Sequence, residues 1–544
     1  YSFLRATARV GLTKNVSRDE QFKSPKHPDY RETDELKQAS FSASTSEAFS
    51  YNGDLNIAFG KLFVEKHQVN VVGGWSFSEN KNKRDGYSVV GFNDDLHMNP
   101  AFSTGFTDGQ KPNYSLERSR STSFFMNVNY SFMNRYLMDF NVRSDGTSKF
   151  GANKRFSTTW SVGLAWNLHN EEFMKSLGLF TNFKIRASVG NPGNQNFDAY
   201  QAMKIYKYNV ELQNMFGSSA IIDQFGNKDL DWQRTLDKNI GVDISMLRNR
   251  IRVTLDYYYK DTDPLLISVP MPPSVGVGSI NANAGRQLSW GWNGSIFGTV
   301  IQKQDLSWTL NANFRTSKSE YRDIGDKLNE FNELGSAQSL VRYYEGASPD
   351  DMWAVPSLGI DPATGAEMFR KKDGSQTFIY STADEVVVGC SRPDVEGVIG
   401  SSFYYKGFSA SVNFRYRLGG EVMASALYSK VENISEEQIY YNQDKRALHD
   451  RWKQPGDKAK FKSIKDNSAT PMSSRFVRTE NTFSGESISM GYESSAVWIK
   501  KIGAEGVTFR AYMNDIFRVS SFKEERGTDY PFDRTVSFSL SLRF

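Results

Sequence analysis

The sequence predicts an all-β protein, a transmembrane antiparallel β-barrel. Three observations support this: apolar and polar residues alternate along many segments, the segments are about 10–12 residues long, and tight turns alternate with long polar connections. Strand side chains point alternately to two faces, so strict alternation gives one apolar and one polar face. A soluble sheet also alternates, but its strands average about 5–6 residues, whereas a tilted strand needs about 9–11 to cross a bilayer.

The composition fits a barrel and argues against several other classes. Hydrophobic residues are 39% of the 544 residues and the net charge is only +4, so nothing suggests a nucleic-acid binder. No run of about 18 apolar residues is present to form a transmembrane helix. The single cysteine, Cys390, rules out an internal disulfide and multi-cysteine metal sites. The five histidines lack the i, i+4 spacing of metal ligands, so we predict no metal and no cofactor.

The alternating pattern recurs in about sixteen segments. The last one, Val536 to Phe544, places apolar side chains on one face and mainly serines on the other. Aromatic residues lie near segment ends, as Trp160 and Trp166 do, which is typical of an interfacial girdle. The predicted strands start near residues 2, 53, 66, 121, 134, 158, 180, 236, 250, 286, 305, 397, 408, 484, 506 and 535.

Short and long connections alternate between these strands. Tight turns are predicted at 133–134, 248–249, 302–304 and 406–407. Outer-membrane barrels have short periplasmic turns and longer extracellular loops. We therefore expect large extracellular loops near residues 13–52, 78–120, 191–235, 261–285, 317–396, 419–483 and 515–534. About sixteen strands fit either a complete porin or the later part of a 22-stranded transporter with a plugged lumen.

Seven stretches carry more specific motifs. Residues 142–151 read VRSDGTSKFG, residues 184–197 read KIRASVGNPGNQNF, and residues 359–365 read GIDPATG. The others lie within 159–174, 261–284, 405–408 and 530–544. In this order they resemble the SusC/RagA type of TonB-dependent outer-membrane transporter over essentially the whole chain.

This resemblance implies a bacterial outer-membrane protein that imports oligosaccharides or oligopeptides. A SusD-like surface lipoprotein would cap the barrel, and the TonB complex would act through a plug domain. The resemblance begins near the seventh of 22 strands, so we expect residues 1–544 to be the barrel portion, without the plug. Two other functions remain open: a passive porin, and a surface adhesin or structural barrel. We expect no enzyme, because no nucleophile elbow, phosphate loop or Ser/His/Asp set is found.

Two groups of strand residues are candidates for function. The resemblance implies that the C-terminal strand is a signal for outer-membrane assembly; otherwise its apolar residues simply face lipid. These residues are Phe538, Leu540, Leu542 and Phe544. By alternation, Arg143 and Asp145 face the lumen, where they form an ion pair or contact substrate.

Candidate contacts to substrate or to the lid lie in the long connections. Asn194 and Asn196 offer amides for sugar hydroxyls, in a stretch that is also a strong turn composition. Six loop aromatics could stack on sugars, contact peptides, seal a partner, or pack the loops on themselves. They are Tyr343, Tyr344, Trp353, Tyr440, Tyr441 and Trp452. Residues 361–365 and 371–374 are predicted to be two turns that bracket a short β-hairpin.

Overall fold

The computed structural model describes residues 3–92, 99–107, 111–149, 155–194, 203–215, 217–227, 231, 233–271, 274, 276–283, 285–324, 332, 339–440, 442–496, 499, 503–523 and 533–544. Most of these residues form one antiparallel sheet of 19 strands. Three of its strands are short: β4 (Gly105–Phe106), β9 (Gly193–Asn194) and β18 (Lys318–Arg322). Subtracting these three from 19 leaves sixteen long strands, as predicted.

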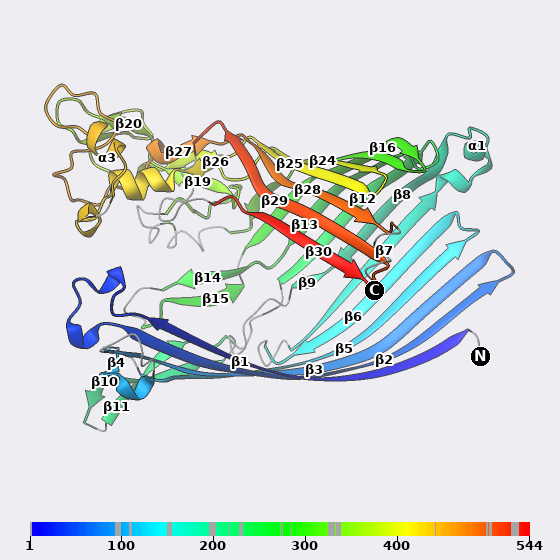
Figure 1. The fold of residues 1–544 in the computed structure, drawn as a ribbon, viewed down its shortest axis with the longest axis horizontal. Helices are drawn as coiled ribbons and strands as arrows, with labels where there is room; N and C mark the ends of the chain where they lie inside the picture. The colour runs from blue at the N-terminus through cyan, green and yellow to red at the C-terminus, as the bar shows by residue number, and fades with distance from the viewer. Residues whose placement is uncertain are drawn as a thin grey trace.

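The long strands follow one another in chain order, each paired with the next (Figure 1). They are β1 (Leu4–Lys23), β2 (Ser40–Phe63), β3 (His67–Val90), β5 (Asn113–Phe132), β6 (Tyr136–Thr147), β7 (Phe156–Asn167), β8 (Phe180–Asn191), β12 (Gln233–Met246), β13 (Ile251–Thr262), β16 (Arg286–Lys303), β17 (Leu306–Arg315), β24 (Val395–Tyr405), β25 (Phe408–Leu418), β28 (Thr482–Ser494), β29 (Gly506–Ser520) and β30 (Val536–Arg543). Within the described residues β1 pairs only with β2 and β30 only with β29, so the sheet is an open arc.

Several predicted connections are wrong in extent. β1 and β2 pair continuously from Leu4↔Phe59 to Lys23↔Ser40, so the predicted loop at 13–52 shrinks to residues 24–39. Pairing of β3 with β5 likewise reduces the loop at 78–120 to residues 91–112. β29 continues to Ser520, beyond the predicted loop start at 515. These strands extend beyond the segments in which apolar and polar residues alternate. Backbone hydrogen bonds between strands can form there whether or not either face of the sheet is apolar.

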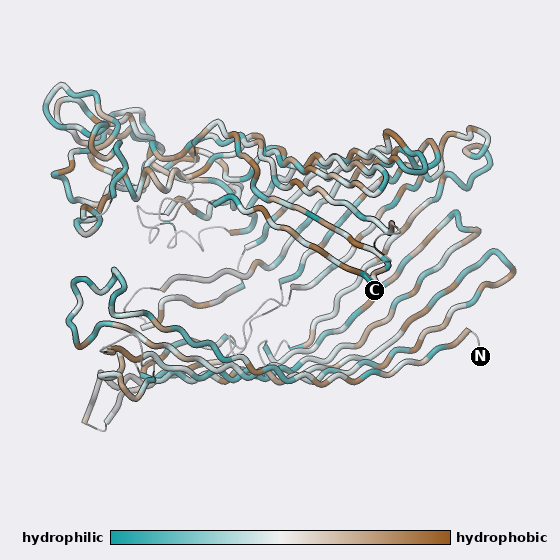
Figure 2. The backbone as a smooth tube through the Cα atoms, viewed as in Figure 1, coloured by the Kyte–Doolittle hydropathy of each residue, from teal (hydrophilic) through white to brown (hydrophobic). Residues whose placement is uncertain are grey.

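The two faces of the sheet differ as alternation predicts. On one face, cross-strand neighbours form an apolar row across β2 to β8: Phe59, Val71, Val128, Phe140, Val162 and Val189. On the other face, Asn127 lies opposite Asn141, which lies opposite Ser161. Brown and teal therefore alternate along the strands in Figure 2. The polar face is the concave one, because a cavity on β6 to β17 and another on β17 to β30 are lined mainly by its residues.

Short and long connections separate to opposite ends of the sheet. The short turns use left-handed residues, such as Met133 and Asn134 between β5 and β6, and Lys406 and Gly407 between β24 and β25. The turn predicted at 302–304 lies slightly later, because β16 continues to Lys303. Both termini and α1 (Glu172–Lys175) lie at this short-turn end, and the long connections lie at the other, the long-loop end (Figure 1). In the described part of the chain, no helix has the length and apolar character to span a membrane.

The long connections contain structure of their own. Two of these connections each contain an antiparallel pair of strands. β10 (Ile205–Asn214) pairs with β11 (Gly217–Gln224), and β14 (Leu266–Pro270) pairs with β15 (Ser279–Asn283). The connection after β18 holds β19 (Asp351–Ala354), β20 (Ser357–Ile360), β21 (Glu367–Arg370), β22 (Gln376–Thr377) and β23 (Val386–Cys390). The connection after β25 holds β26 (Glu421–Met423), η8 (Leu427–Glu432), η9 (Glu437–Tyr440), α3 (Arg446–His449), η10 (Ser474–Phe476) and β27 (Val477–Thr479).

Candidate functional site

The concave face carries a cavity of about 830 Å³ on strands β6 to β17. Its wall is made mostly of hydroxyl, amide and charged side chains, which can exchange hydrogen bonds with a polar solute. Its polar lining includes Asn141, Arg143, Ser161, Ser188, Asp237, Asn239, Lys260, Ser289, Asn293, Arg315 and Arg392. Period-two alternation puts the strand residues among these on one face, so their gathering follows from strand order and register, and Arg392 is added by the connection before β24.

Arg143 and Asp145 form the predicted ion pair. The Arg143 Nε lies 2.7 Å from Asp145 Oδ1, and the Ser123 hydroxyl donates to the same carboxylate at 2.5 Å. Asp145 is buried, whereas the Arg143 side chain is half exposed and lines the cavity. Phe125 interrupts the apolar alternation of β5, and its ring centroid lies 5.9 Å from the Arg143 guanidinium carbon. Asp145 therefore holds the guanidinium at the wall while leaving part of it accessible.

A second ion-pair group fixes charges on the same face of β8, β12 and β13. Arg186 lies 3.0 Å from Asp243 and 2.8 Å from Asp256. Gly241 makes room for this group, because a Cβ there would lie 2.3 Å from an Asp256 carboxylate oxygen. Opposite charges are thus paired side by side along the wall.

At the long-loop end, the connections 317–394 and 419–481 pack together into one loop body. The Ser474 amide donates to the Val355 carbonyl at 3.1 Å, and the Ser357 amide donates to the Ser474 hydroxyl at 2.9 Å. The Cys390 amide donates to a Glu421 carboxylate oxygen at 2.7 Å. These contacts join residues far apart in sequence, so the two connections support each other.

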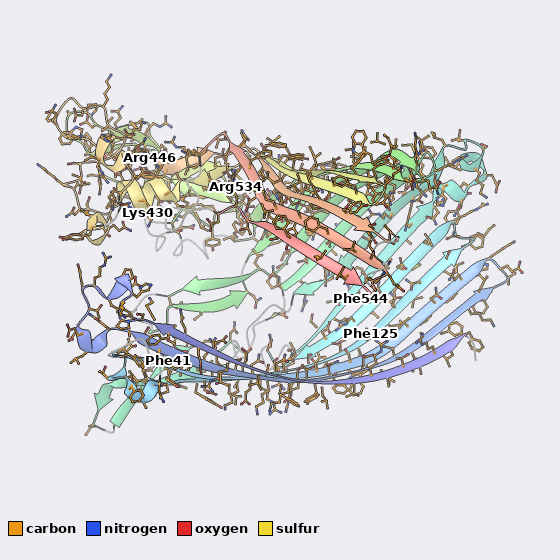
Figure 3. The ribbon with its side chains drawn as sticks, viewed as in Figure 1. Phe41, Phe125, Lys430, Arg446, Arg534 and Phe544 are labelled. Carbon is orange, nitrogen blue, oxygen red and sulfur yellow. The ribbon has the colours of Figure 1, made fainter. Side chains whose placement is uncertain are left out.

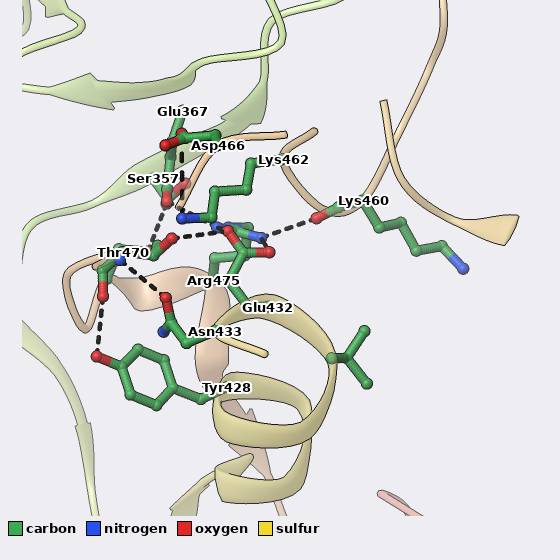
Figure 4. Close-up of polar contacts among 12 residues, drawn as sticks. Ser357, Glu367, Tyr428, Glu432, Asn433, Lys460, Lys462, Asp466, Thr470 and Arg475 are labelled. Atoms are coloured by element: carbon green, nitrogen blue, oxygen red, sulfur yellow. Dashed lines mark hydrogen bonds and ion pairs between the residues drawn. The ribbon is translucent and has the colours of Figure 1, made fainter. Parts of the chain in front are cut away.

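A buried charge group lies inside the loop body (Figure 4). Arg475 lies 2.7 Å from Glu367 and 2.9 Å from Glu432, and all three side chains are nearly removed from water. Burial alone would lower the pKa of Arg475, but hydrogen bonds to the two carboxylates outweigh it and raise that pKa. The Thr470 hydroxyl completes the group by donating to Glu432 at 3.0 Å.

Sequence reasoning missed this group. Arg475 and Glu367 are 108 residues apart, and no spacing rule joins single charges over that distance. The only signal was their position in long connections that also contain many aromatic residues. The two predicted turns at 361–365 and 371–374 are present, but a single strand lies between them in place of the predicted hairpin: β21 pairs with β20 on one side and β22 on the other.

Four candidate aromatics pack within the loops. The Tyr343 ring lies 5.7 Å from the Tyr321 ring, and the Tyr344 and Trp353 rings lie 4.6 Å apart. The Trp452 indole N–H donates to the Pro362 carbonyl at 2.9 Å. These contacts correspond to the self-packing alternative.

The other loop candidates differ in accessibility. Tyr440 is 86% exposed and therefore accessible to a partner. Tyr441 and Asn196 lie outside the described residues. For Asn194 only the backbone is described, in β9 opposite Gln233.

The candidate assembly residues lie on the apolar face of the last strand. Phe538, Leu540 and Leu542 lie opposite Ala511, Phe509 and Val507 of β29. Phe538 and Leu540 are largely exposed, as lipid-facing residues are in the isolated chain. Phe544 follows β30 at the short-turn end (Figure 3).

No metal centre is found in the part of the chain that the structure describes, since no three His, Cys, Asp or Glu residues there are grouped to hold an ion. Comparisons with known proteins identify the family of the chain. A family model described as TonB dependent receptor-like, beta-barrel matches residues 2–347. The chain is similar to TonB-dependent receptor P39 of Formosa agariphila, with 24% identity over 86% of this chain and 49% of that protein.

Two further proteins, one known by sequence and one by structure, are also similar to this chain. TonB-dependent receptor SusC of Bacteroides thetaiotaomicron is 26% identical over 78% of this chain and 44% of that protein. A chain of the RagAB peptide transporter superposes with a TM-score of 0.80 at 21% identity, over 96% of this chain and 57% of that chain. The chain spans about half the length of the curated relatives it matches. It belongs to the TonB dependent receptor-like β-barrel family, as an outer-membrane barrel of the SusC/RagA type.

Proposed function

We propose that this chain forms the wall and outer loops of a TonB-dependent importer of oligosaccharides or oligopeptides. One observation carries the proposal: a concave wall of paired charges, amides and hydroxyls leads to a large folded loop body at one end. Both solute classes present many hydrogen-bonding groups and are recognised through such donors and acceptors. In this proposal the long-loop end is extracellular, a plug from elsewhere in the protein closes the lumen, and TonB drives uptake.

The loop body is also proposed to dock a SusD-like surface lipoprotein. Its packing supports this assignment, because interior contacts such as Arg475 with Glu432 hold the outer surface in a defined shape. A preorganised surface loses less conformational entropy on binding. Tyr440, on η9, is an exposed aromatic residue of the kind enriched at binding hot spots.

Uptake by the full-length protein in its outer membrane tests the transport proposal. Cells carrying it would be given labelled oligosaccharides or labelled oligopeptides, with and without a functional TonB. We expect uptake of one class, and its loss without TonB. Uptake that persists without TonB would establish the passive porin instead, and no uptake of either class would favour the adhesin or structural barrel.

Site-specific photo-crosslinking tests the lipoprotein lid. A photoreactive residue at Tyr440 should capture a lipoprotein in intact cells. The matched control is Val64, which is 82% exposed against 86% for Tyr440 but lies in a turn at the short-turn end. Equal capture at both positions, or capture at neither, would contradict docking at the loop body.

A further inference from the structure

The apolar face of β1, β2, β3 and β5 turns basic as these strands approach the long-loop end. Phe77 and Thr122 are opposite one another on this face, and the next two rows toward the long loops carry charges. In the first row Tyr51 lies opposite Glu79, which lies opposite Arg120; in the second, Lys14, Phe49, Lys81 and Arg118 are successive neighbours. We call Lys14, Lys81, Arg118 and Arg120 the basic rim.

One buried carboxylate organises the two arginines of the basic rim. The Arg118 Nε donates to Glu79 Oε1 at 2.6 Å, and the Arg120 Nε donates to Glu79 Oε2 at 2.6 Å. The Tyr51 hydroxyl donates to Oε2 at 2.9 Å. Glu79 is buried, whereas both arginine side chains are about half exposed. Glu79 thus holds two guanidinium groups side by side while leaving part of each accessible.

In the described part of the chain, the two rows of the basic rim hold more positive than negative side chains. These rows contain four cations and one carboxylate, Glu79, which contacts Arg118 and Arg120, so their formal charges sum to +3. In the next row toward the long loops, the positive charge of Lys83 is matched by negative charges. Lys83 lies 3.4 Å from Asp85 and opposite Glu47. Lys81 lies directly opposite Arg118, and like charges in that position destabilise a sheet. A bound anion would remove this repulsion.

The apolar belt is the band of apolar side chains on the outer face of the strands. The distance of the basic rim from this belt indicates which anion it can reach. Lys81 is four residues beyond Phe77, which is about 13 Å along a strand and about 10 Å along the membrane normal for a strand tilted by about 40°. The apolar band of such barrels is about 25 Å tall, and lipid headgroups lie immediately beyond it. The basic rim also faces outward, on the same side as the exposed aromatic residues Trp75 and Phe124.

We propose that the basic rim binds phosphate groups on the headgroup of a membrane lipid, in the leaflet at the long-loop end. Arginine forks bind two phosphate oxygens at once, and lysines add point charges. The lipid chains would then lie along the apolar belt below. This assignment rests on the outer-membrane location and is independent of the transported solute.

The test uses the full-length protein in nanodiscs that contain a lipid with two phosphate groups on its headgroup. Retention of this lipid is measured by native mass spectrometry, and folding by heat-modifiable gel migration. For Lys81→Gln with Arg118→Gln we expect about tenfold to thirtyfold weaker binding, since each basic residue near a membrane surface contributes about 1 kcal/mol. The single variant Arg118→Lys should bind more tightly than Arg118→Gln.

The control changes two exposed cations at the other end. Lys61→Gln with Lys66→Gln alters charges beside the turn between β2 and β3 and should leave retention unchanged. Equal retention in the two double variants would overturn the proposal. A lipid lacking the phosphates should not be retained by the unaltered protein, and its equal retention would also overturn it. Complete displacement of the lipid by millimolar inorganic phosphate would reassign the rim to free phosphate.

Discussion

Arg342 and Glu385 form a two-pronged ion pair in the interior of the loop body. The Arg342 Nε and Nη2 atoms lie 2.7 and 2.6 Å from the two Glu385 carboxylate oxygens. Arg342 is 1% exposed and Glu385 2%, so water solvates neither charge. Arg342 also donates to the backbone carbonyls of Ser339 and Val341, and the Tyr380 hydroxyl donates to Glu385. This pair joins the segment before β19 to the segment before β23.

Breaking this pair should destabilise the loop body locally. Arg342→Met leaves Glu385 as a buried, uncompensated charge, which costs about 3–5 kcal/mol. Hydrogen exchange should accelerate across 339–390 and stay unchanged in β5 and β6. Adding Glu385→Leu should restore much of the protection, because no charge then remains buried. Arg18→Met is the control, since the exposed Arg18–Glu20 pair is worth at most about 1 kcal/mol.

Gly365 should be essential for docking the segment around Trp452. Its φ is +75°, and a Cβ would lie 2.5 Å from the Trp452 ring. Gly365→Ala therefore adds a steric clash of about 1–3 kcal/mol to a backbone strain of about 1–2 kcal/mol. Gly374→Ala is the matched control, because Gly374 has a φ of +86° and nothing within 4 Å of a Cβ. Limited proteolysis should cleave near 453–460 faster only in the Gly365 variant.

The turn after β20 should weaken in acid. The Thr364 hydroxyl donates to Asp361 at 2.7 Å, and this hydrogen bond holds the pKa of Asp361 below its ordinary value. Because the pKa of Asp361 is lower in the folded state, its ionised carboxylate stabilises the folded turn. This stabilisation is complete above about pH 4 and is lost as the pH falls through the folded-state pKa. Hydrogen exchange of 359–366, corrected for intrinsic rates, should rise in that window. Thr364→Ala should flatten the change, and an equally steep rise in that variant would contradict the mechanism.

Removing Phe544 should impair assembly of the barrel. Phe544 ends the alternating apolar set of β30 and is 77% exposed, so its loss removes little packing within the chain. We therefore expect lower outer-membrane levels without a matching loss of stability in the protein that does assemble. Ser541→Ala changes the polar face of the same strand and serves as the control. Normal outer-membrane levels after deletion of Phe544 would contradict an assembly role.

The sequence by itself determined the sixteen strands, their two faces and the alternation of short and long connections. These features are local, because period-two alternation assigns a face and left-handed residues such as Asn134 mark the turns. Phe125 breaks the alternation, and only the structure shows its place beside Arg143 on the polar face.

Only the tertiary structure decided how far the strands extend and how the loops fold. β1 reaches Lys23 because its backbone pairs with β2 to the end, although its side chains no longer alternate. The loop body depends on contacts such as Arg475 with Glu367, which join residues distant in sequence and follow no period. Local patterning specifies which face a side chain occupies, whereas distant ion pairs form only when the folded chain brings buried charges together.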